Sequence, residues 1–197
     1  MAGRIIKSFI VILLILVLLA AAAAGYYFFR VAPLIQAGKQ QGLSVSASDR
    51  PSVADFGFET AGGTHQRIAD LQGKVVVVDV WATWCGTCRS SIPKVIELRN
   101  KYLNQPVEVI GLNVDDDGWV KAKPFLQKYP EINYTVAVPY PAPSFLLKSI
   151  VDLKPLGEVS ALPTFFVVDR YGRLAGKFIE LGHDEEIDDL VAKLLTE

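Results

Sequence analysis

The chain has 197 residues, of which 20 are Lys or Arg and 21 are Asp or Glu, so its formal net charge is −1. All 21 acidic residues but only 17 of the basic ones follow Arg30, which gives that part a net charge of 17 − 21 = −4. This acidic balance speaks against nucleic acid as a partner, because phosphates are bound by basic surfaces.

An apolar segment without any charged residue occupies residues 9–29. It is long enough to cross a bilayer as a helix, for which about 20 apolar residues suffice. Arg4 and Lys7 precede it, which favours a cytoplasmic N-terminus and export of the rest of the chain. A cleaved signal peptide is the alternative, because the alanine run 20–24 offers a cleavage site. Both interpretations place the remainder outside the cytoplasm.

The sequence predicts three parts. Residues 1–30 form a membrane anchor or signal peptide, and residues 31–51 form a linker with Gln, Gly and Ser and little periodicity. Residues 52–197 form one folded domain of about 150 residues, a usual domain size. We therefore expect a single-pass protein of the inner membrane with its domain on the periplasmic side.

A buried strand that leads into a helix is predicted around the only two cysteines. Residues 75–81 (VVVVDVW) are apolar and β-branched apart from Asp79, which is typical of a central strand buried on both faces. Beyond Cys88 the apolar residues recur at helical spacing. Cys85 and Cys88 therefore lie at a helix N-terminus, where unpaired N–H groups and the helix dipole favour a thiolate. At positions i and i+3 the two sulfurs share one face, which predicts dithiol–disulfide exchange.

The remaining elements alternate between strands and helices. Pro124 should kink the second helix or delay its start. A proline-rich loop at 139–143 serves as a connector or shapes a partner surface. In chain order we predict an edge hairpin that begins with a strand at 53–60 and turns at Gly62-Gly63, a turn at 68–71, a strand at 107–114, a helix at 119–129, a strand at 132–138, a helix at 145–153, a strand at 164–168, a turn at 169–172, a strand through 179 and a helix at 184–195.

Acidic residues stand before two of these helices. The triple aspartate 115–117 precedes the helix at 119–129, and Asp184 precedes the last helix, so both are predicted to provide caps. A cation site at the triple aspartate is the alternative, but no further ligands are evident. A zinc site at Cys85 and Cys88 would need two more ligands from a second Cys or His pair. We expect neither a metal nor a cofactor.

The residues around the cysteines resemble the active site of the thioredoxin superfamily. The phrase VDVWATWC is most similar to the membrane-anchored, TlpA/ResA-like branch. Asp79 lies six residues before Cys85, and Pro93 lies eight residues after it, as in that family. The resemblance covers residues 53–195. It implies a three-layer α/β sandwich, in which a mixed central sheet carries helices on both faces.

The two cysteines and Asp79 are assigned separate roles. Cys85 stands at the exposed end of the helix and is the expected nucleophile, whereas Cys88, one turn inward, is the resolving thiol of a redox-active Cys85–Cys88 disulfide. A carboxylate in a valine strand is costly to bury, so the pKa of Asp79 should rise, which suits a proton acceptor for Cys88. An aspartate at a strand end facing water is the alternative.

The resemblance also implies a loop opposite the cysteines. Leu162-Pro163-Thr164 matches the family's cis-proline loop, and a cis Pro163 would leave the neighbouring backbone free to pair with a substrate chain. Leu162 and Thr164 are therefore expected to bind substrate. Trp84 is expected to join them and to pack beside the cysteine pair, which it would shield.

The function that follows is a membrane-tethered thiol–disulfide oxidoreductase that reduces exported proteins, for example in cytochrome c maturation. Its partners would be protein thiols and disulfides and a membrane electron donor. The intervening Gly86 and Thr87 carry no charge and no imidazole, which favours a reducing couple. A disulfide-forming oxidant and a non-catalytic binding module on the same scaffold are the alternatives.

Overall fold

The computed structural model describes residues 16–17, 19–22, 25–26, 42–141, 144–147 and 150–197. Two compact units divide the chain, residues 1–40 and residues 41–197. Most of the predicted anchor, 9–29, lies outside the described residues. Within the part that is described, no helix has the length and apolar character that crossing a membrane requires.

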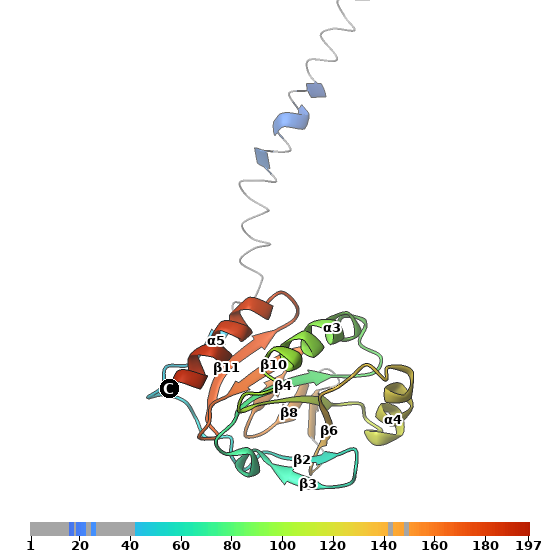
Figure 1. Cartoon of the computed structure of the whole chain (residues 1–197). Coiled ribbons are helices and arrows are strands. Elements are labelled where there is room, and N and C mark those ends of the chain that lie inside the picture. The colour runs from blue at the N-terminus through green and yellow to red at the C-terminus, as the bar shows by residue number, and fades with distance from the viewer. Residues whose placement is uncertain (1–15, 18, 23–24, 27–41, 142–143, 148–149) are drawn as a thin grey trace, which may run out of the picture. The chain divides into compact units, whose positions relative to one another are not determined.

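The second unit is built on one large mixed sheet (Figure 1). Its strand order is β1-β11-β10-β4-β5-β6-β2-β3, and β7, β8 and β9 form a separate three-stranded sheet. In chain order the elements are β1 (Leu43–Ser44), β2 (Gly57–Thr60), β3 (His65–Arg67), the 3-10 helix η2 (Ile68–Leu71), β4 (Val75–Trp81), α3 (Gly86–Lys101), β5 (Val107–Asn113), α4 (Trp119–Lys128), β6 (Thr135–Pro139), β7 (Ser144–Leu147), β8 (Ile150–Leu153), β9 (Gly157–Val159), β10 (Thr164–Val168), β11 (Leu174–Ile179) and α5 (Asp184–Thr196).

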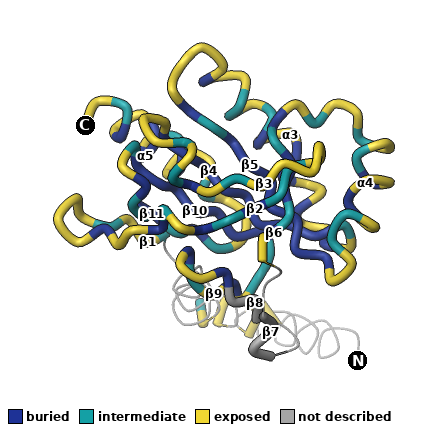
Figure 2. The backbone as a smooth tube through the Cα atoms, turned by 90° about the horizontal axis from the view of Figure 1, so that it is seen from below, coloured by how far each residue is buried: buried dark blue, intermediate teal, exposed yellow. Residues whose placement is uncertain are grey.

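Strand β4 is central, as its valine run predicts. It pairs in parallel with β5 and antiparallel with β10, and all seven of its residues are buried. Figure 2 shows the central strands in dark blue and the connecting loops largely in yellow. A strand covered on both faces needs apolar side chains in both directions, which explains the absence of alternation.

The long helices α3, α4 and α5 contribute to one hydrophobic cluster, which covers a single face of the large sheet. Residues from the β8–β9 region, the one-turn helix η2 and the segment before β2 cover the other face: Leu153, Leu156, Val159, Ile68, Val53 and Phe56. Among the described residues, η2 is the only helix that packs on this second face, so the predicted helices on both faces are present there as a single turn.

This difference comes from residues 145–153, which were predicted as a helix. Of these, 145–147 belong to β7 and 150–153 to β8, and β8 pairs with β9 in register Val151↔Val159. The spacing of apolar residues fits both structures, and the adjoining β9 decides for the strand, because pairing satisfies the backbone groups of all three segments.

Several predicted elements are confirmed. The edge hairpin is present as β2 and β3, and the predicted turn at 68–71 is η2. Helix α4 begins at Trp119 and includes Pro124, which excludes the late start. On α5 the predicted apolar stripe is buried at Ile187, Leu190, Val191 and Leu194.

The predicted caps are wrong. Gly118 is the N-cap of α4 and His183 is that of α5, and neither makes a side-chain capping bond. Asp184 is the first residue inside α5, where an acid still complements the helix dipole. Asp115 turns back toward the strand ends instead, as described below.

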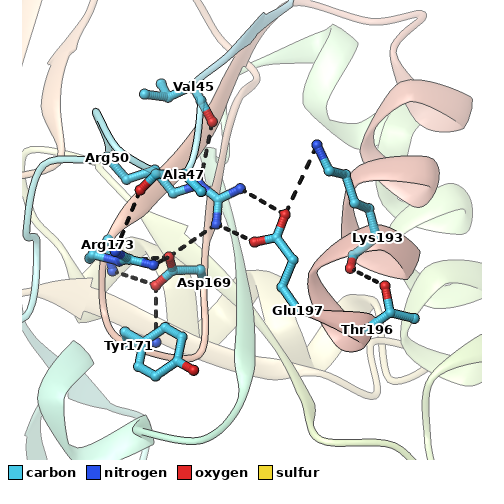
Figure 3. Close-up of polar contacts among 9 residues, drawn as sticks. All are labelled: Val45, Ala47, Arg50, Asp169, Tyr171, Arg173, Lys193, Thr196 and Glu197. Atoms are coloured by element: carbon cyan, nitrogen blue, oxygen red, sulfur yellow. Dashed lines mark hydrogen bonds and ion pairs between the residues drawn. The ribbon is translucent and has the colours of Figure 1, made fainter.

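The domain begins earlier than residue 52, because part of the predicted linker is folded onto it. Strand β1 pairs with β11, and the buried Arg50 makes the contacts with Asp169 and Glu197 that Figure 3 draws. Arg50 Nη1 lies 3.2 Å from Asp169 Oδ2 and 2.6 Å from Glu197 Oε2. Burial raises the pKa of Asp169, but N–H donors from Arg173 and Tyr171 and the guanidinium groups of Arg173 and Arg50 outweigh it and hold that pKa below its usual value.

Candidate active site

The cysteine pair lies where the structure passes from β4 into α3. Cys85 has extended backbone angles and is the N-cap of α3, and Cys88 belongs to its first turn. The two form a disulfide with an S–S distance of 2.06 Å and a Cα–Cα distance of 5.3 Å. The N–H of Cys88 donates to Cys85 Sγ at 3.1 Å. The local sequence thus places a backbone donor against the first sulfur, where it would also stabilise a thiolate.

The two sulfur-bearing residues differ in access. Cys85 is 5% exposed and Cys88 is 1% exposed, so a partner reaches the pair through Cys85. This order agrees with the expectation that Cys88 lies one turn inward. Thr87, between them, is exposed, and its Oγ1 lies 3.2 Å from Cys85 Sγ.

The loop at residues 161–163 reaches the cysteine pair through Thr87. The Leu162–Pro163 peptide bond is cis, as expected. Thr87 Oγ1 donates to the Leu162 carbonyl oxygen at 3.2 Å, so this loop lies beside the disulfide. Leu162 is half-buried. Thr164 is fully buried and its hydroxyl donates to the Ala161 carbonyl at 2.7 Å, so its side chain supports the loop and does not face a substrate.

Trp84 does not shield the cysteines by packing into the core. It is 70% exposed, whereas Trp81 is buried and packs on Phe125 with ring centroids 4.9 Å apart. This exposure excludes a core position for Trp84, and the expectation that it packs beside the cysteine pair stays a prediction. An exposed indole next to the disulfide is instead suited to contact with another protein, since tryptophan is enriched at such contacts.

Asp79 is buried in β4 and is 2% exposed. Its neighbours at i±2, Val77 and Trp81, belong to the same hydrophobic cluster as Cys85 and Cys88, so strand alternation turns Asp79 toward α3. The alternative of a water-facing aspartate is thereby excluded. Burial raises the pKa of Asp79 to about 7. Within the described part of the chain Asp79 Oδ1 has no hydrogen-bond partner.

A glycine opposite Asp79 leaves room for an aromatic ring. Gly111 of β5 pairs with Asp79, and a Cβ there would lie 2.8 Å from the Tyr134 ring and 3.2 Å from Trp81 Nε1. Any larger residue would displace one of the two rings. Burial and the charge of Asp79 both raise the pKa of Tyr134, so its phenol stays protonated. Asp79 is therefore the group in this cluster that can gain and lose a proton near neutral pH.

Sequence reasoning missed a polar clamp that fixes the turn before Cys85. The carboxylate of Asp115 accepts from the Thr83 N–H at 3.0 Å, the Thr83 hydroxyl at 3.1 Å and Asn113 Nδ2 at 2.8 Å. Arg89 Nη1 donates to the Thr83 carbonyl at 3.2 Å. The signal available was the position of Asp115, directly after a buried strand whose parallel neighbour ends at the cysteines.

Two side chains of the triple aspartate contact neighbouring groups of the protein. Among the residues that the structure describes, no group of three or more His, Cys, Asp or Glu side chains is placed to hold an ion. The triple aspartate does not converge, because Asp115 binds Thr83 while Asp117 lies 3.9 Å from Lys121.

Comparison with known proteins places these observations in a family. The model of the Redoxin family matches residues 47–194. Thiol-disulfide oxidoreductase ResA from a strain of Bacillus cereus is 29% identical over 134 residues, which cover 67% of this chain and 70% of the relative. ResA of Bacillus subtilis is 26% identical over 138 residues, covering 70% and 68%.

Solved structures show the same fold. A Chlorobium tepidum structure assigned as the thiol:disulfide interchange protein DsbE is 26% identical and matches with a TM-score of 0.59, covering 74% of this chain and 96% of the other. A secreted thiol-disulfide isomerase from Corynebacterium glutamicum, 21% identical, matches with a TM-score of 0.64 and coverages of 80% and 93%. At that identity the second match speaks for the fold alone.

Proposed function

The chain belongs to the Redoxin family and is a thiol–disulfide oxidoreductase, and we propose that it acts outside the cytoplasm as a membrane-tethered reductant of exported proteins. The observation that carries the chemistry is the Cys85–Cys88 disulfide at the N-terminus of α3, beside the Leu162–Pro163 loop. The tether rests on the uncharged segment 9–29 and its flanking basic residues.

In the reduced protein the thiolate of Cys85 attacks one sulfur of a substrate disulfide. A mixed disulfide forms, and the other substrate sulfur leaves as a thiolate that takes up a proton. Cys88 then loses its proton and attacks Cys85 Sγ, which releases the second substrate thiol and restores the disulfide. The protein dithiol gives up two electrons and two protons, and the substrate disulfide takes them up to become two thiols.

Asp79 is the proposed proton acceptor for Cys88. Its pKa of about 7 allows it to accept a proton from a thiol and to return it at physiological pH. Its position on the α3 face of β4 puts it in the layer that contains Cys88. Because Cys88 is almost inaccessible to solvent, an internal acceptor is needed.

Substrate binding is proposed at the surface formed by Trp84 and the Leu162–Pro163 loop. Trp84 offers an exposed apolar face next to Cys85, and the backbone of Leu162 can pair with an extended substrate chain. Thr164 is proposed to support this loop through its hydrogen bond to the Ala161 carbonyl. The proposed partners are proteins with thiols or disulfides, among them those of cytochrome c maturation, and a membrane electron donor that restores the dithiol.

The proposed direction of electron flow rests on the charges around the two cysteines. Gly86 and Thr87 provide no cation between the cysteines, and an ionised Asp79 nearby disfavours a second negative charge. Both effects favour the disulfide over the thiolate and make the dithiol a better reductant.

Two measurements test the proposal. Cys88→Ala should accumulate a mixed disulfide between Cys85 and its natural substrate, and identification of the captured protein names that substrate. Equilibration with glutathione should give a potential near that of thioredoxin, about −270 mV, whereas a value near that of DsbA, about −120 mV, would mean that the protein forms disulfides.

A further inference from the structure

The hydroxyl of Thr87 stands between two acceptors and carries one proton. Its Oγ1 lies 3.2 Å from Cys85 Sγ and 3.2 Å from the Leu162 carbonyl oxygen. In the disulfide, Cys85 has no S–H, so the Thr87 hydroxyl is the only donor of the three groups. The strength of the two acceptors therefore decides where the proton points.

Oxidation state changes that balance. A disulfide sulfur is a weak acceptor, so in the oxidised protein the hydroxyl donates to the Leu162 carbonyl. A thiolate carries a full negative charge and forms a charge-assisted hydrogen bond about twice as strong as a neutral one. On reduction the proton should therefore turn from Leu162 to Cys85 Sγ.

This reorientation of the Thr87 hydroxyl changes the surface on which a substrate would bind. Among the described residues, Thr87 is the only hydrogen-bond partner of the Leu162 carbonyl. Leu162 lies outside the strand ladder that begins at Thr164, and it is half-buried. When the Thr87 hydroxyl leaves it, this carbonyl is free to accept from a backbone N–H of an extended substrate chain.

We propose that Thr87 is a redox-linked switch, whose hydroxyl stabilises the Cys85 thiolate in the reduced protein and occupies the Leu162 carbonyl in the oxidised protein. This rests on the proposed function, because it makes the reduced form the one that binds an extended chain and the oxidised form the one that releases it. A reductant requires that order, since its substrate arrives when the protein carries a dithiol.

The acceptor of the Thr87 hydroxyl can be determined from the NMR signal of the Leu162 carbonyl. Leu162-Pro163 is the only Leu-Pro pair in the chain, so labelling with ¹³C-carbonyl leucine and ¹⁵N proline gives a single coupled resonance. In the oxidised full-length protein Thr87→Val should shift that carbonyl resonance, because the hydrogen bond is lost. In the reduced protein, above the pKa of Cys85, the same substitution should leave it nearly unchanged. Equal shifts in both states would overturn the switch.

The thiolate half of the proposal has its own measurement. Thr87→Val and Thr87→Ala should raise the pKa of Cys85, followed by the pH dependence of alkylation, by about one unit, a tenfold loss of thiolate below that pKa. Thr87→Ser keeps the hydroxyl, so the pKa of Cys85 and the Leu162 carbonyl resonance should both stay close to those of the wild type. An unchanged pKa in Thr87→Val would overturn the assignment. Reduction of insulin by the wild-type protein tests the proposed function separately, because it involves no Thr87 variant.

Discussion

Replacing Asp79 by Asn should make the stability of the oxidised protein much less dependent on pH. Burial holds the pKa of Asp79 at about 7, against an ordinary value of 3.8. A difference of about 3 pH units corresponds to about 4 kcal/mol, at 1.36 kcal/mol for each unit. Because the pKa is raised in the folded state, the native protein binds the extra proton. The contribution of this proton to the free energy of unfolding is therefore fully present below about pH 4 and is lost as the pH rises through 7.

The asparagine variant lacks this titration, since its amide stays neutral. The free energy of unfolding of Asp79→Asn minus that of the wild type should increase by up to about 4 kcal/mol between pH 4 and pH 8. Urea unfolding of the disulfide-bonded proteins at several pH values measures it, and oxidation keeps the cysteines from titrating. Asp116→Asn, which removes an exposed carboxylate, is the matched control and should show little change.

A difference between Asp79→Asn and the wild type that stays constant with pH would refute the reasoning. It would mean that Asp79 keeps an ordinary pKa despite its burial, and it would remove the basis for its role as proton acceptor. The same variant should slow the release of a mixed disulfide by Cys88, more strongly above pH 7, where the wild-type carboxylate is ionised and can accept a proton, than below it. Exchange rates that match the wild type from acid to alkaline pH would leave Asp79 without a catalytic role.

Alkylation of the reduced protein at neutral pH should label Cys85 much faster than Cys88, because Cys85 is the more accessible and has N–H and hydroxyl donors. Mass spectrometry measures the order of labelling, and faster labelling of Cys88 would exchange the two roles. Asp115→Ala should cost about 1–3 kcal/mol and slow insulin reduction, because it leaves the Thr83 N–H without a partner, whereas Asp117→Ala on the surface should do neither. Protease added to intact spheroplasts should digest the folded domain, and protection would contradict export.

The site was predictable where local sequence carries the structure. The valine run of β4 and the helical spacing after Cys88 are consecutive in the chain, so their periodicity placed both cysteines at the N-terminus of α3. The burial and direction of Asp79 followed from its place in that strand. These features depend on neighbours a few residues away, which one sequence displays directly.

Contacts between distant segments were not predictable in the same way. Arg50 and Asp169 are 119 positions apart in the sequence, and Thr83 and Asp115 are 32 apart. The residues around either member of a pair do not predict which distant residue it contacts. The strand conformation of residues 150–153 depends likewise on pairing of β8 with β9. Their apolar spacing is compatible with a helix, and tertiary pairing overrides such a local preference.

The residues least favourable to a stable β-sheet lie together on the face that carries the cysteines. Asp79 is a carboxylate in a valine strand, Gly111 leaves a strand position without a side chain, and the buried nitrogen Nε1 of Trp81 has no partner among the described residues. Each lowers stability by itself, since a buried polar atom without a partner and a glycine in a strand both cost free energy. The opposite face of the same strands is packed with apolar residues such as Val78 and Ile110. Asp79 and Gly111 therefore fit the proposed proton transfer to and from Cys88 better than they fit the needs of a stable sheet.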